Sequence, residues 1–284
     1  MQNKRYFITY GDSGYEQAKA RICNQAAAIG EFDHIIAYGR EDLSLEIQQS
    51  QLFHIKRGGG LWCWKPDVIL TTLGRMSDGD CLIYCDAGCT LQRAKEWSRL
   101  WKRLQNYDII ASRIFQRTDR WTRRELLDYM RPTNPQNWER YFQHMATTII
   151  IKKSSFTVRF FQEWKTLLLR HPEFVMDVSE VERASQHPTF VENRHDQSVY
   201  SALVYKYLNH QMTRDRIFSM WEHIEDFDIF HGQAIRATRL RKGEKKLPLK
   251  QEVKAAIKRM IKDYVYKPLW IIPHQWYYER KTNH

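Results

Sequence analysis

The stretch Asp80-Cys81-Leu82-Ile83-Tyr84-Cys85-Asp86-Ala87-Gly88 decides the predicted fold. Its central residues form a short apolar run without alternation, which is typical of a strand buried on both faces. We expect the strand to end where Asp86-Ala87-Gly88 begins. A carboxylate at the end of a buried strand is costly unless a cation or hydrogen-bond donors meet it. The stretch therefore predicts either a functional carboxylate at a sheet edge or an ordinary turn aspartate before a glycine.

The segments on either side of this strand alternate between strand and helix patterns. Further strands are predicted at 4–10, 34–38, 108–112 and 147–151. Helices are predicted at 16–28, 43–51, 67–76, 96–105, 155–169 and 196–209. This alternation favours an α/β fold with a mainly parallel, doubly wound sheet. In such sheets ligands bind beyond the carboxyl ends of the strands.

The positive charge is concentrated at one end of the chain. The 284 residues carry a net charge of +12, from 45 Lys and Arg against 33 Asp and Glu. Residues 236–284 hold 14 Lys and Arg and 4 Asp and Glu, a net charge of +10, which leaves +2 for residues 1–235. A nearly neutral body disfavours a protein whose whole surface binds nucleic acid. We therefore expect a globular domain at 1–235 and a basic extension at 236–284.

The composition predicts a globular protein of the cytoplasm. No window approaches the roughly 18 consecutive apolar residues of a membrane-spanning helix. The segment 1–10 resembles a strand and lacks the apolar region of a signal peptide. The five cysteines show no CxxC spacing, so we expect reduced thiols.

Two further motifs are expected at the same edge of the sheet. In Gly58-Gly59-Gly60-Leu61-Trp62-Cys63-Trp64-Lys65-Pro66, glycines would let backbone N–H groups approach a phosphate, and Lys65 would neutralise a diphosphate near a helix N-terminus. The alternative is a flexible loop followed by a tryptophan anchor. In Arg194-His195-Asp196-Gln197-Ser198, four hydrogen-bonding side chains precede an apolar helix. Asp196 is alternatively a simple N-cap.

Together these motifs resemble those of GT-A glycosyltransferases. Tyr84-Cys85-Asp86-Ala87-Gly88 resembles the strand end that carries the DxD motif in that family, and His195-Asp196-Gln197-Ser198 resembles its Asp-Gln motif. Trp62-Cys63-Trp64-Lys65-Pro66, Trp121-Thr122-Arg123-Arg124 and Phe161-Gln162-Glu163-Trp164 follow in an order similar to bacterial polysaccharide-biosynthesis transferases. The resemblance covers about residues 6–232 and implies a GT-A fold.

The resemblance also implies a metal site and a catalytic pair. Asp86 matches the first aspartate of DxD, which holds Mn²⁺ or Mg²⁺ against the donor diphosphate, while Gly88 departs from the second. His231 matches a metal-ligating histidine of the family, and a partly buried loop histidine is the alternative. If no metal binds, Lys65 and nearby arginines must neutralise the diphosphate. Asp196 and Gln197 match the position beneath the sugar in retaining enzymes.

The expected donor-binding residues are Tyr10, Asp12, Lys65, Asp86, Ala87, Gly88 and His195. The resemblance implies that Asp12 lies near the base and ribose, where Tyr10 or Tyr38 would stack on the base. The expected acceptor-binding residues are Arg113, Trp121 and Arg123. They come from a stretch of five arginines at 113–124 that would meet an acidic or phosphorylated acceptor, and the alternative is a solvated basic loop.

The basic extension has the pattern of a membrane-surface helix. From Lys250 the apolar residues recur at helical spacing beside a stripe of lysines, and tryptophans and tyrosines follow next to basic residues. The extension is therefore expected to bind an anionic membrane surface, and the alternative is a helix that packs on the body.

These observations favour one function over two others. The leading prediction is a bacterial cytoplasmic glycosyltransferase, peripheral on the inner face of the membrane, that moves a sugar from a nucleotide-diphosphate donor to a glycan or lipid-linked acceptor of a surface polysaccharide. A nucleotidyltransferase is disfavoured because Gly11-Asp12-Ser13-Gly14 lacks a basic residue. A nucleic-acid or membrane-binding protein acting through the tail is the non-enzymatic alternative.

Overall fold

The computed structural model of the chain describes residues 3–131, 141–221, 233–240 and 257. Its strands are β1 (Arg5–Tyr10), β2 (His34–Tyr38), β3 (Cys81–Cys85), β4 (Thr90–Leu91), β5 (Ile109–Arg117), β6 (Phe142–His144), β7 (Thr148–Lys152), β8 (Ile217–Trp221) and β9 (Ile235–Arg236). Its α-helices are α1 (Glu16–Ile29), α2 (Leu45–Gln48), α3 (Gly58–Leu61), α4 (Trp64–Leu73), α5 (Glu96–Asn106), α6 (Thr118–Trp121), α7 (Arg124–Tyr129), α8 (Ser155–Arg170), α9 (Glu180–Arg183) and α10 (Asp196–Leu208).

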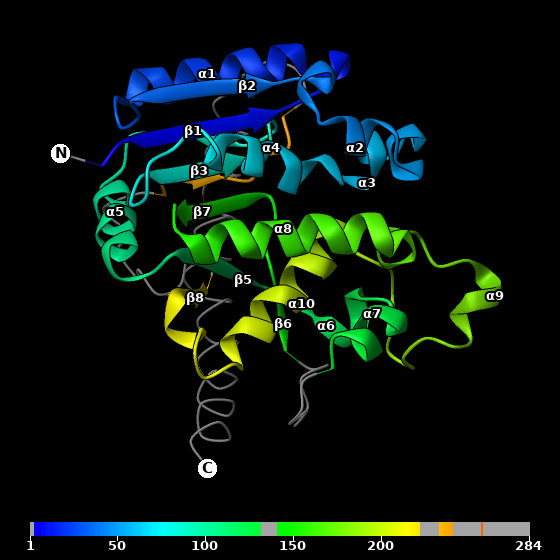
Figure 1. Cartoon of the computed structure of the whole chain (residues 1–284). Coiled ribbons are helices and arrows are strands. Elements are labelled where there is room, and N and C mark those ends of the chain that lie inside the picture. The colour runs from blue at the N-terminus through cyan, green and yellow to red at the C-terminus, as the bar shows by residue number, and fades with distance from the viewer. Residues whose placement is uncertain (1–2, 132–140, 222–232, 241–256, 258–284) are drawn as a thin grey trace.

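A seven-stranded mixed sheet forms the centre of the molecule (Figure 1). The strand order is β2-β1-β3-β7-β5-β6, and β8 also pairs with β5. Strands β2, β1, β3, β5 and β8 run in one direction, whereas β7 runs antiparallel to both β3 and β5, and β6 runs antiparallel to β5. The predicted mainly parallel α/β sheet is therefore confirmed, but the reversed direction of β7 was not predicted, and the sequence analysis missed β6 and β8.

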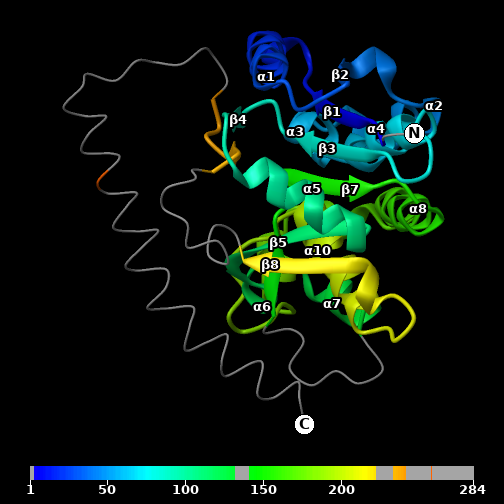
Figure 2. The ribbon, with the colours of Figure 1, turned by 90° about the vertical axis from the view of Figure 1, so that its left-hand side faces the viewer.

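Alternating side chains of the central strands build two apolar layers. In β1, Ile8 joins the layer beneath α4, α8 and α10, while Phe7 joins the layer beneath α1 and α5. In β3, Tyr84 and Ile83 divide in the same way. Figures 1 and 2 show helices on both faces of the sheet. Because successive residues of a strand point to opposite faces, a strand buried on both sides needs the unbroken apolar run seen in β3.

The chain after residue 232 returns to the body. Strand β9 pairs with β4 antiparallel, with Arg236 opposite Thr90. Residues 236–240 therefore pack against the body, although the predicted boundary placed them in the extension. The rest of the extension, except residue 257, lies outside the described residues, as does the membrane-binding helix predicted there.

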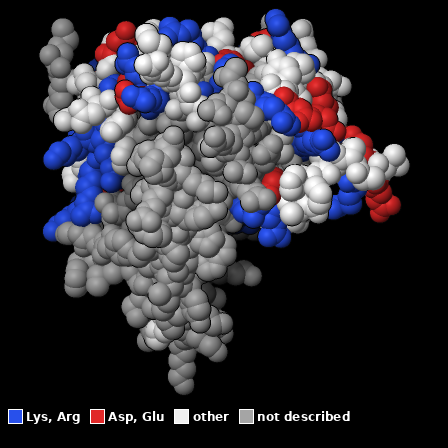
Figure 3. Space-filling model, turned by 90° about the horizontal axis from the view of Figure 1, so that it is seen from below, with Lys and Arg blue, Asp and Glu red and all other residues white. Residues whose placement is uncertain are grey.

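The described surface carries charges of both signs. Seen from below in Figure 3, basic side chains gather along one edge, and acidic and basic side chains mix along the other. None of the helices in the described part of the chain has the length and apolar character needed to cross a membrane.

Candidate functional site

The carboxyl ends of β1 and β3 place two predicted residues at one edge of the sheet. These strands are parallel neighbours with Ile8 opposite Tyr84, so the chain leaves β1 after Tyr10 and β3 at Asp86 on the same side. This is the edge where open α/β sheets bind ligands. Tyr10 is buried, and its ring stacks on Trp64 with 3.9 Å between centroids.

A buried lysine joins the two predicted carboxylates. The ammonium of Lys65, on the first turn of α4, lies 2.7 Å from Asp196 Oδ2 and 3.4 Å from Asp86 Oδ1. It also donates to the carbonyl oxygen of Ala146 at 3.0 Å. Its hydrogen bonds go to Ala146 and Asp196, and Asp86 adds an ion pair at a longer distance. Lys65 therefore links two carboxylates, that of Asp86 at the end of β3 and that of Asp196 at the start of α10.

Burial and charge act against each other in this cluster. Burial by itself would lower the pKa of Lys65, but the Asp196 and Asp86 carboxylates outweigh it, and the pKa is raised. Burial raises the pKa of Asp196 in spite of Lys65. The side chains of Lys65 and Asp196 are 2% and 7% exposed, so both depend on each other for the hydrogen bonds that water would otherwise supply.

Tyr84 is a member of the cluster that the sequence prediction missed. Its hydroxyl donates to Asp86 Oδ1 at 2.5 Å. Burial, followed by the nearby Asp86 charge, raises the pKa of Tyr84, which keeps the hydroxyl a donor. A signal was present, because residues two apart in a strand share a face and Tyr84 precedes Asp86 by two.

The glycine-rich motif forms a left-handed turn. All five residues 58–62 have positive φ, including Leu61 at 49° and Trp62 at 61°. Glycine adopts such angles freely, whereas each L residue there costs roughly 1–2 kcal/mol. The turn sends the Trp62 ring onto His195, with 5.3 Å between centroids, and the Trp64 ring onto Tyr10. The turn thus places the rings of Trp62 and Trp64 at the edge of the sheet.

His195 has strained backbone directly before α10. Its φ of 53° and ψ of −125° are rarely adopted by a residue with a side chain. Its Nδ1 hydrogen-bonds the carbonyl oxygen of Val175 at 2.7 Å, so Nδ1 is the donor. Its Nε2 is buried without a hydrogen-bond partner among the described residues, and the nearest carboxylate oxygen, from Asp177, is 3.7 Å away. Non-glycine strain of this kind clusters at functional sites.

Gln197 is oriented by two other amides. Its Nε2 donates to Gln143 Oε1 at 2.6 Å and to Gln116 Oε1 at 3.1 Å. Gln143 in turn donates to the carbonyl oxygen of Trp121 at 2.9 Å. Since the two hydrogens of Gln197 Nε2 are both used, the group left for a ligand is the carbonyl oxygen Oε1. Nothing in the sequence pointed to Gln116 or Gln143.

Ala87 and Gly88 form the turn after β3, and Asp12 follows β1. The carbonyl oxygen of Ala87 accepts from Arg21 Nη2 at 2.9 Å. That of Gly88 accepts from Thr238 Oγ1 at 2.9 Å and from the backbone N–H of Leu240 at 3.0 Å. Asp12 accepts from the N–H of Gly14 at 3.0 Å. Their roles toward a donor stay predictions.

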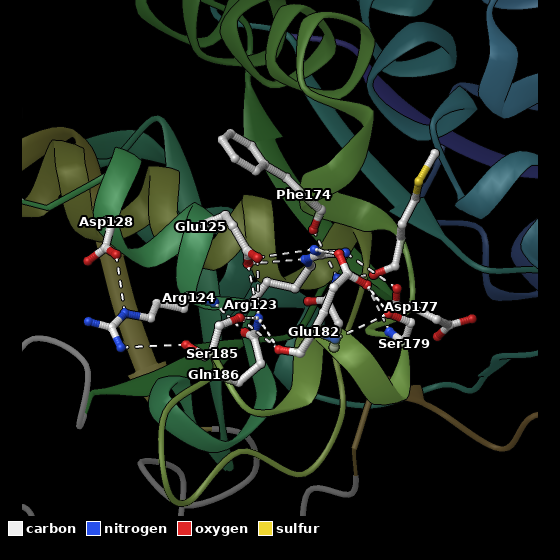
Figure 4. A network of polar contacts seen from close by, with 12 residues as sticks. Arg123, Arg124, Glu125, Asp128, Phe174, Asp177, Ser179, Glu182, Ser185 and Gln186 are labelled. Carbon is white, nitrogen blue, oxygen red and sulfur yellow. Dashed lines mark hydrogen bonds and ion pairs between the residues drawn. The ribbon is translucent and has the colours of Figure 1, made fainter.

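The predicted acceptor residues divide into two groups. Trp121 lies next to the site, because its carbonyl oxygen accepts from the N–H of Arg194 at 3.1 Å and the Arg194 guanidinium lies 4.2 Å from its ring centroid. Arg113 lies in β5 opposite His144. Arg123 is buried and forms a separate network (Figure 4).

The Arg123 network holds the segment around α9 in place. The guanidinium lies 2.7 Å from Glu182 and 3.2 Å from Glu125, and it donates to the carbonyl oxygen of Asp177 at 3.3 Å. Figure 4 shows the Glu125 and Glu182 side chains converging on Arg123. The arginine is thus used to anchor residues 177–182, which disagrees with the prediction that it faces an acceptor.

His144 predicts a pH dependence of stability. It is fully buried beside Arg113, and its pKa lies well below the ordinary value because of burial first and Arg113 second. Below pH 6.5 the unfolded chain binds a proton on His144 that the folded chain does not, so stability falls as the pH falls. Urea unfolding at pH 7.5 and 5.5 should show a loss about 1.4 kcal/mol larger in the wild type than in His144→Asn. The exposed His54→Asn should keep the wild-type loss, and equal losses in all three proteins would contradict the assignment.

The expected Mn²⁺ or Mg²⁺ site is not matched by the described residues. Asp86 Oδ1 already faces Tyr84 and Lys65, and Gly88 supplies no carboxylate. No group of three or more His, Cys, Asp or Glu side chains within the described ranges is placed to hold a metal ion. His231, the second predicted ligand, lies outside those ranges.

The chain resembles several solved structures in its fold. No protein-family model and no curated protein matches it. A glycosyltransferase involved in glycosylation of the major capsid of PBCV-1 is 7% identical, with 78% of this chain and 83% of that chain covered and a TM-score of 0.41. The galactosyltransferase LgtC, with donor and acceptor sugar analogues, is 12% identical over 74% and 82%, with a TM-score of 0.38. Mouse xyloside xylosyltransferase 1 is 11% identical over 76% and 85%, with a TM-score of 0.41.

Proposed function

We propose that the protein is a glycosyltransferase that uses a nucleotide-diphosphate sugar. The observation that carries this proposal is the pair Asp86 and Asp196, held together by the buried ammonium of Lys65 beyond the end of β3. The cluster lies at the ligand-binding edge of the sheet, and Gln197 follows it on α10. These are the residues whose sequence motifs resemble those of GT-A enzymes.

The reaction requires two kinds of electrostatic help. The bond between the anomeric carbon and the diphosphate breaks, the acceptor oxygen bonds to that carbon, and the acceptor proton is released. The sugar passes through an oxocarbenium-like state that negative groups stabilise. Asp196, held by Lys65, supplies a carboxylate, and Gln197 Oε1, for which no donor is seen among the described residues, supplies the partial negative charge of an amide oxygen. This arrangement supports transfer with retention of configuration.

The donor base and ribose would lie near the end of β1. Tyr10, stacked on Trp64, and Asp12 after the strand provide an aromatic surface and a carboxylate there. Gly59 lies beside Asp12, because a Cβ atom added to Gly59 would lie 3.6 Å from Asp12 Oδ2. The absence of a side chain at Gly59 leaves room for a ligand next to Asp12.

The acceptor is proposed to be a glycan or lipid-linked sugar of a bacterial surface polysaccharide, such as O-antigen, capsule or lipopolysaccharide. The support is the +10 charge of residues 236–284 together with their aromatic and amphipathic pattern, which suits an anionic membrane surface on the cytoplasmic side.

A thermal-shift panel of UDP, GDP, CMP and dTDP compounds tests the proposal. At least one nucleoside diphosphate and its sugar should raise the melting temperature, because a ligand of the folded state stabilises it. Released nucleoside diphosphate should then appear when that sugar donor is incubated with the protein. Stabilisation by none of the compounds, or binding without any release, would contradict the proposal. Salt-dependent binding of single-stranded DNA in place of nucleotides would favour the non-enzymatic alternative.

A further inference from the structure

The backbone of residues 239–240 packs closely against Gly88, the position where the DxD motif has its second carboxylate. A Cβ atom on Gly88 would lie 3.2 Å from Cα of Arg239. This contact is fixed by the hydrogen bonds that Thr238 and Leu240 donate to the carbonyl oxygen of Gly88. A side chain at position 88 would therefore fit only if the backbone of residues 239–240 moved slightly, and the segment that crowds it carries an arginine.

Lys65 is not available to replace the missing positive charge at the diphosphate. Its ammonium already hydrogen-bonds Ala146 and Asp196 and pairs with Asp86, and its side chain is 2% exposed. Other positive groups near this edge are therefore better placed to meet a diphosphate than Lys65 is.

Three arginines from separate segments lie around the same cluster. The backbone of Arg239 packs against Gly88, and Gly88 lies two residues after Asp86. Arg194 precedes Asp196 by two residues. Arg57 binds both oxygens of Asp177 at 2.8 Å, and Asp177 lies 3.7 Å from the imidazole of His195.

The positive charges of these arginines are only partly compensated. Arg57 pairs with Asp177 and Arg194 with Glu192, at 3.0 Å. Arg239 is exposed, has a φ of 57°, and shows no ion pair with another described residue. Burial lowers the pKa of Arg194, and the positive charges of Arg239 and Arg57 lower it further against the opposing effect of Glu192, so both arginines repel Arg194. Arg194 Nε is also buried without a described partner.

We propose that Arg57, Arg194 and Arg239 form an anion site that binds the diphosphate of the donor in place of a divalent cation. The inference rests on the proposed function and assigns its phosphate-binding residues. A diphosphate relieves the repulsion among the guanidinium groups, and each guanidinium offers paired N–H donors that match two phosphate oxygens. When the bond between the anomeric carbon and the diphosphate breaks, the same guanidinium groups stabilise the negative charge of the departing nucleoside diphosphate.

Calorimetric titration with UDP, GDP and dTDP tests the assignment, once in EDTA and once in Mn²⁺. The wild type should bind one of them in EDTA, and Mn²⁺ should change its affinity by less than about threefold. A metal ion that contacted the diphosphate directly would change the affinity by more than about tenfold. Arg239→Gln and Arg194→Gln should each weaken binding about tenfold. Arg124→Gln, an exposed arginine on α7 that pairs with Asp128, is the matched control and should bind as the wild type does.

The outcomes separate this inference from the proposed function. Binding that needs Mn²⁺, or that survives both arginine substitutions, overturns the arginine site but leaves the glycosyltransferase proposal standing. If the wild type binds only with Mn²⁺ and His231→Ala loses that binding, a metal ion held by His231 supplies the positive charge at the diphosphate instead. Absence of nucleotide binding in both buffers overturns both. Melting temperatures within the range of the Arg124→Gln control show that the variants are folded.

Discussion

Replacing Lys65 with methionine is expected to lower the free energy of unfolding by about 3–5 kcal/mol, because it leaves the Asp196 carboxylate buried without its counterion. The same change should abolish detectable sugar transfer, since Asp86 and Asp196 lose the group that holds them together. Urea unfolding measures the first effect, and release of nucleoside diphosphate from the donor sugar measures the second.

Lys165→Met provides a matched control for this change. Lys165 also joins two carboxylates, Asp67 at 2.8 Å and Glu46 at 2.7 Å, and its ion pairs among the described residues include neither Asp86 nor Asp196. This variant should lose stability and keep its turnover. A Lys65→Met protein that is destabilised by less than about 1 kcal/mol would show that the buried pair does not hold the two segments together.

Replacing Asp196 with asparagine is expected to lower turnover about 10²–10³-fold, the effect typical of removing one group that stabilises transition-state charge. The side chains have nearly the same shape, so the Lys65 contact loses charge while the fold is kept. The loss should appear in kcat more than in the affinity for the nucleoside diphosphate, because Asp196 is proposed to act on the sugar.

The buried Asp67→Asn serves as the comparison for Asp196→Asn. Asp67 lies on α4 with Lys65 but accepts from Ser44 and pairs with Lys165. Asp67→Asn should retain turnover within about threefold of the wild type, a smaller change than the loss of one charged contact to the reacting sugar would cause. Equal activity of both aspartate variants would remove Asp196 from the reaction.

The sequence was sufficient to predict the parts of the site that depend on local pattern. The apolar run before Asp86 and the alternation of strands and helices place the carboxylate at a sheet edge, because the carboxyl ends of parallel strands share that edge. Likewise, the polar residues before an apolar helix mark Asp196 at the start of α10.

The contacts among those parts could not be predicted in the same way. Lys65 and Asp196 are 131 positions apart, and no periodicity reports that one meets the other. The reversed direction of β7 has the same cause, since a buried strand shows the same apolar run in either orientation. Arg123 was misjudged because a buried arginine and a surface arginine look alike until their carboxylate partners, Glu125 and Glu182, are seen.

The return of residues 235–240 to the turn after β3 also bears on how the protein is made. The hydrogen bond from Thr238 to Gly88 spans 150 positions, and β9 pairs with β4 only after nearly the whole body has been synthesised. Contacts this distant in sequence form late, because the intervening chain must first be ordered. A ribosome-bound chain that ends before residue 235 therefore lacks Arg239 and the contacts with Gly88, and we expect it to lack the proposed diphosphate site.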